Sequence, residues 1–197
     1  MDRKQEIWQL DQDVRIDMMA ANAQEFHRLL DDDDTITNGF LRHFAGLFEL
    51  LSAQQEAGLK GPLRYITMSF LKSSVIAETY EIATTCHSND IFMDEAETET
   101  YWRMDFIRDM VDRDMERIVP GLKGEIYRIR GYEIEEFREL YALSYTALLL
   151  TFFSRVLHSI FELPEFLAVK KENLVDISFG GYMEESVMLA QYGNEGA

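Results

Sequence analysis

Apolar residues at helical spacing dominate this chain, and the longest such stretch covers residues 132–161, with no Gly or Pro inside. Its first apolar positions recur every three or four residues. Between Leu140 and Phe153 they continue around the whole helix, as is typical of a helix buried on most sides. No charge falls between Glu139 and Arg155, a gap shorter than the ~20 apolar residues of a membrane span. The pattern therefore predicts a buried central helix.

Two more amphipathic helices are predicted in the first third of the chain. Residues 3–30 carry an apolar stripe at helical spacing, and the four aspartates 31–34 end it because they repel one another and compete for backbone donors. A second helix begins at Asn38-Gly39 and closes at Gly58, since glycine is favoured just after a helix C-terminus.

The middle of the chain mixes helix and strand patterns. Residues 63–74 fit either state, and we favour helix because Pro62 stands where helices often begin. Residues 79–87 alternate with a period of two and predict a half-buried strand. After turn-forming residues, 91–93 are compatible with the second strand of a hairpin.

The remaining predicted elements are shorter. They are a helix over 104–118 that ends at Pro120-Gly121, a short strand over 125–130, a short helix after Pro164, a strand over 175–179, and a helical turn or strand over 182–190. The expected fold class is α+β, mainly α, with five or six helices around the helix at about 132–161 and a small antiparallel sheet. No repeat or linker composition divides the chain, so we expect a single domain over 1–197 whose last five residues are frayed.

The charge of the chain narrows the choice of partner. It has 19 basic and 36 acidic residues, a formal net charge of −17. Such a surface repels phosphate backbones, so nucleic acid is not expected as a partner, and a protein with a basic face or a metal cation is favoured. The ordinary alternative is an acidic surface that only keeps the protein dissolved. A homo-oligomer stays open.

One cysteine excludes an internal disulfide. The first ten residues have no hydrophobic signal region, so we expect a cytoplasmic protein without a membrane segment. The cysteine, Cys86, lies in the predicted strand next to His87, and adjacent strand residues point to opposite faces. We therefore interpret Cys86 as a buried core thiol.

Motifs for known chemistry are absent from the sequence. No histidine follows an acidic residue at the spacing of a di-metal site, and the zinc-protease, EF-hand, nucleotide-loop and nucleophile-elbow patterns are missing. No cofactor and no catalytic residue are predicted, and the chain leans towards a non-enzyme.

Two groups of residues remain as candidate sites. An acidic loop of a histidine and five carboxylates is compatible with a divalent cation, with an acidic interface, or with a solvated cap; it consists of His87, Asp90, Asp94, Glu95, Glu97 and Glu99. Tyr141 and Tyr145, on the central stretch, are the candidates for a ligand pocket, because Met and Tyr together suit an adaptable cavity.

Three hypotheses about function follow. The leading one is a non-catalytic cytosolic binding protein, such as an inhibitor, an immunity-type factor or an adaptor, with an acidic surface for a basic protein partner. The second is a small-molecule binder with a Met- and Tyr-lined pocket beside the central helix. The third is a metal-dependent enzyme that uses the 87–99 loop.

Overall fold

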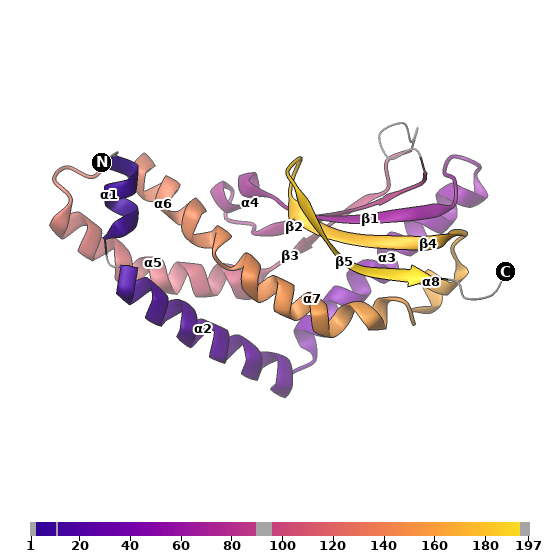
Figure 1. Ribbon diagram of the computed structural model, residues 1–197, viewed down its shortest axis with the longest axis horizontal. Coiled ribbons are helices and arrows are strands. Elements are labelled where there is room, and N and C mark those ends of the chain that lie inside the picture. Colours follow the sequence, from indigo (N-terminus) through magenta and orange to yellow (C-terminus); the bar gives the residue numbers. More distant parts are fainter. Residues whose placement is uncertain (1–2, 11, 90–95, 194–197) are drawn as a thin grey trace. The chain divides into compact units, whose positions relative to one another are not determined.

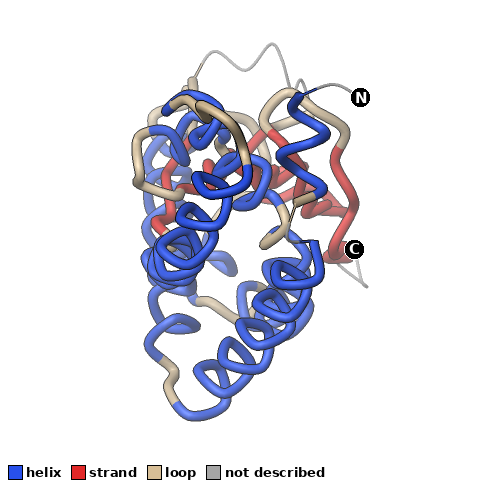
Figure 2. The backbone as a smooth tube through the Cα atoms, turned by 90° about the vertical axis from the view of Figure 1, so that its left-hand side faces the viewer, coloured by secondary structure: helices blue, strands red, loops and turns tan. Residues whose placement is uncertain are grey.

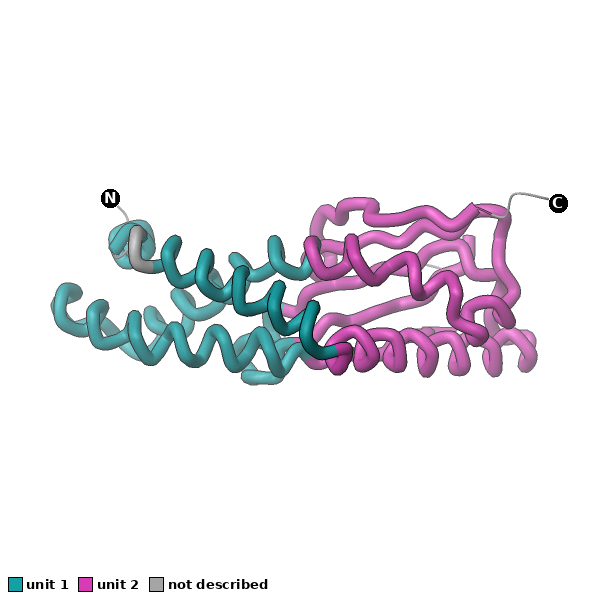
Figure 3. Tube along the Cα trace, turned by 90° about the horizontal axis from the view of Figure 1, so that it is seen from below, with its two compact units in different colours: residues 1–33, 72–80, 104–150 teal, residues 34–71, 81–103, 151–197 magenta. Residues whose placement is uncertain are grey.

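The computed structural model describes residues 3–10, 12–89 and 96–193. Its backbone is mainly helical with one small sheet (Figure 2), so the α+β, mainly α class is confirmed. The contacts divide the chain into two compact units, coloured separately in Figure 3. Unit 1 comprises residues 1–33, 72–80 and 104–150, and unit 2 comprises 34–71, 81–103 and 151–197. The single domain expected from the sequence stays a prediction.

Unit 1 is built from helices (Figure 1). They are α1 (Arg3–Gln9), α2 (Gln12–Asp32), α4 (Lys72–Ile76), α5 (Asp105–Glu125), α6 (Gly131–Leu143) and the first residues of α7 (Thr146–Ile160). The buried side of α5 follows from its apolar residues at three- and four-residue spacing. Phe106 of α5 stacks on Phe26 of α2, with ring centroids 5.3 Å apart, and Arg138 of α6 pairs with Asp112 of α5 at 2.6 Å.

Unit 2 is a five-stranded sheet with helices on one face. Its elements are α3 (Thr35–Glu56), β1 (Leu63–Phe70), β2 (Glu81–His87), β3 (Glu99–Arg103), the remainder of α7, α8 (Pro164–Ala168), β4 (Lys171–Gly181) and β5 (Ser186–Gly193). The strand order is β3-β2-β1-β4-β5, and β1 pairs antiparallel with β2 but parallel with β4. The sheet is therefore mixed, where the sequence suggested antiparallel pairing only.

The core of unit 2 is aromatic. Alternate strand residues face the helices, so that Ile66 lies opposite Cys86 on β2 and Ile177 on β4, and all three are fully buried. Phe40 of α3 meets Trp102 of β3 with ring centroids 4.8 Å apart. The prediction that Cys86 is a core thiol is confirmed, and burial raises the pKa of this thiol to about 12.

A tight hairpin joins β4 to β5. A Cβ atom on Gly180 would lie 2.5 Å from the carbonyl oxygen of Glu185, so the chain needs glycine at this close approach. Met183 in the turn has a φ of 58°, in the left-handed region, and the amide of Tyr182 donates to the carbonyl of Phe70 at the end of β1. The sequence left 182–190 open between a helical turn and a strand; the structure forms the hairpin turn over 182–185 and the strand β5 from Ser186.

Several sequence predictions were wrong. Residues 63–70 form β1 instead of a helix, because Ile66, Met68 and Phe70 alternate into the core and the strand is paired on both sides. Pro120 does not end α5, which continues to Glu125, and the strand predicted over 125–130 is absent.

Other predictions were right in part. The helix over 3–30 is divided into α1 and α2, and α3 closes before Gly58, whose φ is 72°. The stretch predicted over 132–161 is helical from 132 to 160 except for a turn at Ser144-Tyr145, which separates α6 from α7; Phe161 lies in the turn after α7. β3 was missed, and the return strand over 91–93 lies outside the described residues.

One helical stretch, Gly131–Ile160, is long and apolar enough to cross a membrane by length and hydropathy. Half of its apolar window is buried inside the protein, and the core helix of a protein without a membrane segment passes the same test.

Candidate functional site

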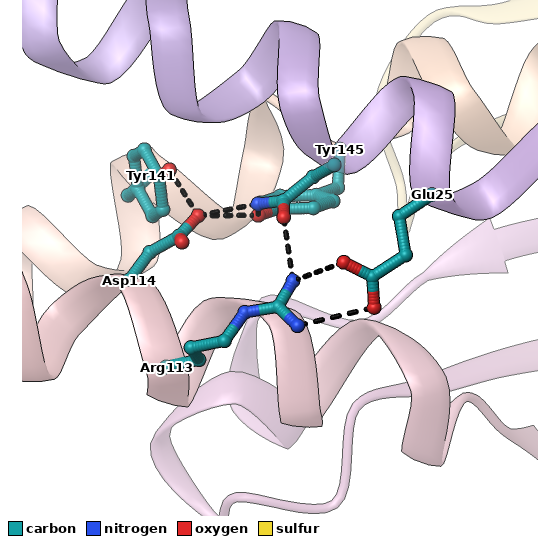
Figure 4. Close-up of polar contacts among 6 residues, drawn as sticks. Glu25, Arg113, Asp114, Tyr141 and Tyr145 are labelled. Carbon is teal, nitrogen blue, oxygen red and sulfur yellow. Dashed lines mark hydrogen bonds and ion pairs between the residues drawn. The ribbon is translucent and has the colours of Figure 1, made fainter.

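A buried carboxylate, Asp114, is the centre of a polar cluster in unit 1 (Figure 4). The residue lies in the middle of α5 and is 2% exposed. Its Oδ2 accepts hydrogen bonds from the hydroxyl of Tyr141 at 2.6 Å, the hydroxyl of Tyr145 at 2.8 Å, and the side-chain amide of Asn22 at 2.6 Å. A carboxylate that is buried must be satisfied in this way, because an isolated charge in the interior is very unfavourable.

Local structure brings these donors together. Tyr141 is in the last turn of α6 and Tyr145 lies four residues later in the turn before α7, so both side chains reach the same side. Burial, with the hydrogen bond to Asp114, raises the pKa of Tyr141. Burial and the neighbouring Tyr141 and Asp114 likewise raise the pKa of Tyr145. Both phenols therefore stay protonated donors at neutral pH.

The cluster continues to the surface through an ion pair. Arg113 of α5 donates to both carboxylate oxygens of Glu25 on α2, at 3.1 and 2.8 Å, and to the amide oxygen of Asn22 at 2.6 Å. The pair is partly exposed, whereas Asn22 is 3% exposed. These groups use their hydrogen bonds on one another, so the cluster is suited to joining α2, α5 and α6 within unit 1.

A pocket lies beside this cluster, at the wall formed by Tyr141. It has a volume of about 450 Å³ and is lined by Trp8, Gln9, Gln12, Arg15, Ile16, Met19, Tyr141 and Ser144. Arg15 is 6% exposed and donates to the backbone oxygen of Trp8. Its guanidinium carbon lies 4.0 Å above the Trp8 ring and 5.5 Å from the Phe137 ring. We call this space the Arg15 pocket; it combines apolar walls with one stacked cation.

The two tyrosines named from the sequence therefore have different places. Tyr141 is among the residues that line the Arg15 pocket, while Tyr145 is buried in the Asp114 cluster. A smaller pocket of about 200 Å³ lies between α1 and α6. It is lined by Arg3, Lys4, Ile7, Trp8, Tyr132, Glu133, Glu136, Phe137 and Leu140.

The acidic loop proposed as a metal site is only partly described. Asp90, Asp94 and Glu95 lie outside the described residues. His87 is half-buried on β2, with its Nε2 3.1 Å from the hydroxyl of Thr67. Glu97 is exposed.

Glu99, the last residue of that set, lies on β3, and its carboxylate is already hydrogen-bonded to neighbouring side chains. It accepts hydrogen bonds from Thr85, at 2.9 Å, and from the hydroxyl of Tyr101. Within residues 3–10, 12–89 and 96–193, no group of three or more potential metal ligands comes together.

A surface that the sequence did not single out lies at the β4–β5 hairpin. Seven consecutive residues from Tyr182 to Met188 are exposed. Four of them are large and apolar, and two are glutamates; they are Tyr182 (55%), Met183 (89%), Val187 (63%), Met188 (60%), Glu184 and Glu185. We call these six residues the hairpin surface. Its only signal in the sequence is the placement of apolar residues beside Glu-Glu after Gly180-Gly181.

Comparison with known protein families, with curated proteins and with solved structures finds no match for this chain.

Proposed function

We propose that this chain is a non-catalytic binding protein whose acidic surface receives a basic protein partner. The observation that carries the proposal is the hairpin surface, where exposed apolar side chains stand next to Glu184 and Glu185. Apolar residues gathered on a surface are typical of interaction sites, and adjacent charge selects the partner by complementarity. We propose the cytoplasm as its location, because a chain with one free thiol needs no oxidising compartment.

The net charge supports this choice of partner. At −17, the protein attracts basic proteins and repels acidic ones over distances of about 8 Å at physiological ionic strength. The apolar residues of the hairpin surface supply the contact that follows the encounter. Binding is therefore expected to begin faster at low salt and to persist through apolar burial at higher salt.

The test compares two double variants of equal charge change. Partners are captured from lysate by the full chain, and their association rates are measured by surface plasmon resonance at about 50 and 500 mM salt. Glu184→Lys/Glu185→Lys should slow association with a basic partner on the order of tenfold at low salt. Glu49→Lys/Glu56→Lys, which changes two exposed residues of α3, should have a much smaller effect. Acidic partners, or equal rates for both variants, would contradict the proposal.

A second candidate function is small-molecule binding in the Arg15 pocket. The stacked guanidinium beside apolar walls suits a planar aromatic carboxylate. Indole carboxylates should raise the Tm of the parent in a concentration-dependent way, and Ile16→Trp, at an exposed position in the wall, should abolish the shift by filling the pocket. An equal shift with the neutral indole carboxamides would contradict this candidate.

A further inference from the structure

We infer that the partner binds as an extended basic segment that pairs with β5 and adds a sixth strand to the sheet. This inference rests on the proposed function, because it says how the partner engages the hairpin surface. β5 is the last strand in the order β3-β2-β1-β4-β5. It pairs with β4, and the structure describes no strand along its other side. The backbone groups on that side are a template for a further strand.

The two edges of the sheet differ in their protection. β3 has five residues, of which Glu99 and Arg103 are charged, and short charged edge strands resist pairing with other chains. β5 has eight residues, Ser-Val-Met-Leu-Ala-Gln-Tyr-Gly, with no charge and no proline. In a chain with 28% charged residues, an uncharged edge strand of this length is suited to pairing.

One irregularity divides β5 into two pairing segments. The register against β4 shifts between Ile177 and Ser178, so that Leu189 is an extra residue on β5. The regular segments are residues 186–188 and 190–193. A partner strand can therefore pair most regularly beside Val187 and Met188, next to the hairpin turn.

Side chains on both faces of β5 favour an apolar partner strand. Val187 lies opposite Phe179, which points into the core, and Met188 lies opposite Ser178 on the other face. Val187 is 63% exposed and Met188 is 60% exposed. A sixth strand with apolar residues at alternate positions would cover both side chains, because cross-strand neighbours lie about 5 Å apart.

The charge around β5 selects a basic segment over a second copy of this chain. Glu184 and Glu185 directly precede the strand and are both exposed, so the end of β5 beside the hairpin carries two negative charges. A lysine or arginine at the end of the partner strand beside the hairpin would meet this negative charge. A second copy would instead bring another −17 chain, with its own glutamates, to the same edge.

The test begins with the selection of displayed peptides of about ten residues on the full-length chain. The best peptide is synthesised, and its affinity is measured by fluorescence anisotropy. It is then N-methylated at one backbone nitrogen at a time. A paired strand uses alternate backbone groups on each side, so every second methylation should weaken binding about tenfold or more, and those between should have little effect. Hydrogen exchange should slow at amides of residues 186–193 when the peptide is bound.

Matched variants place a lysine on each edge strand. Val187→Lys on β5 should weaken peptide binding about tenfold, since an edge lysine blocks pairing and repels a basic segment. Tyr101→Lys, at an equally accessible position on β3, should change the affinity less than about twofold. Circular dichroism of both variants verifies that the fold is retained.

The outcomes separate the two proposals. Selected peptides that lack basic residues, or that bind Glu184→Lys/Glu185→Lys as tightly as the parent, would overturn the proposed function. A second outcome would overturn strand addition alone. In that case peptide affinity depends on Glu184 and Glu185, but the N-methylation scan shows no two-residue period and hydrogen exchange of β5 does not slow. A concentration-dependent dimer of the free protein that protects β5 would show a second copy as the occupant and would also overturn it.

Discussion

The two units of this protein hold their buried residues in different ways. In unit 2, Phe40 is 1% exposed and is surrounded by aromatic rings; in unit 1, Asp114 is 2% exposed and is surrounded by hydrogen-bond donors. Aromatic packing is non-directional in its main, hydrophobic part, whereas each hydrogen bond to Asp114 fixes a distance and an angle. Equal burial therefore conceals two kinds of core, one that depends on volume and one that depends on polar pairing.

The difference shows in what each core can tolerate. Ring centroids of Phe44, Trp102, Phe152 and Phe153 lie 4.8–5.5 Å from that of Phe40. Such a cluster can accept another apolar residue of similar volume at moderate cost. The Asp114 cluster cannot lose its acceptor without leaving buried donors unsatisfied. The chain has two tryptophans, Trp8 in unit 1 and Trp102 in unit 2, so each core has its own fluorescent reporter.

The largest effect is expected from Phe40→Ala. Removing this ring leaves a cavity between four aromatic neighbours and should lower the free energy of unfolding by about 3–5 kcal/mol. Urea unfolding followed by Trp102 fluorescence, in a Trp8→Phe background, measures the loss. Leu50→Ala, at an exposed position of the same helix, is the control and should cost much less. Equal losses would show that unit 2 does not depend on this aromatic cluster.

The next largest effect is expected from Asp114→Ala. Two phenol hydroxyls and the Asn22 amide lose their common acceptor, which should cost about 2–4 kcal/mol. Asp114→Asn keeps one carbonyl oxygen and should recover part of the loss. Trp8 fluorescence in a Trp102→Phe background measures both. If Asp114→Ala is no worse than Asp109→Ala, at a 70% exposed position on α5, the polar cluster does not stabilise unit 1.

A smaller effect is expected from acid in unit 2. Burial lowers the pKa of His43 to about 4, and its ring nitrogen lies 3.0 Å from the hydroxyl of Thr84. As the pH falls below about 6.5, the unfolded chain takes up this proton before the folded one, so stability decreases until the pH reaches about 4. The loss should be about 2 kcal/mol between about pH 7.5 and pH 5.

Two substitutions assign this pH dependence. His43→Gln should flatten the dependence of urea unfolding, measured at Trp102, over that range. His158→Gln, at an 86% exposed histidine, should leave the dependence unchanged. A parent-like slope in His43→Gln would show that another group causes the acid sensitivity.

Local patterns predicted the helices well and their ends less well. The stripes of α2, α3 and α5 are readable because the apolar spacing is helical over many turns. Residues 63–70 were wrongly predicted as helix because Pro62 is a common helix start. They form a strand because β1 pairs with both β2 and β4, and this pairing depends on residues outside the local segment. The turn at Ser144-Tyr145 contains no Gly or Pro, so the local sequence did not predict it. In the folded structure Tyr145 in this turn donates a hydrogen bond to Asp114, which is distant in the sequence.

The candidate sites were harder to predict for a related reason. Asp114 looked like one acidic residue among 36, although it occupies a position of the buried stripe of α5, between Met110 and Ile118. A carboxylate inside an apolar stripe was the available signal. The sequence named Tyr141 and Tyr145 together as candidates for a ligand pocket, which stays a prediction. It contained no indication that Tyr141 lines a pocket while Tyr145 is buried in a polar cluster.

The single thiol of Cys86 allows the opening of unit 2 to be measured by chemical labelling. Alkylating reagents attack the thiolate, and this thiol is both buried and shifted to a pKa of about 12. Modification therefore requires the strand to open first, and the chain has no second cysteine to react or exchange with it. When the reagent is abundant, the labelling rate equals the rate of opening of β2; when it is scarce, the rate reports the fraction of molecules open at any moment. One side chain thus gives access to the lifetime of the native sheet, a quantity that equilibrium unfolding does not contain.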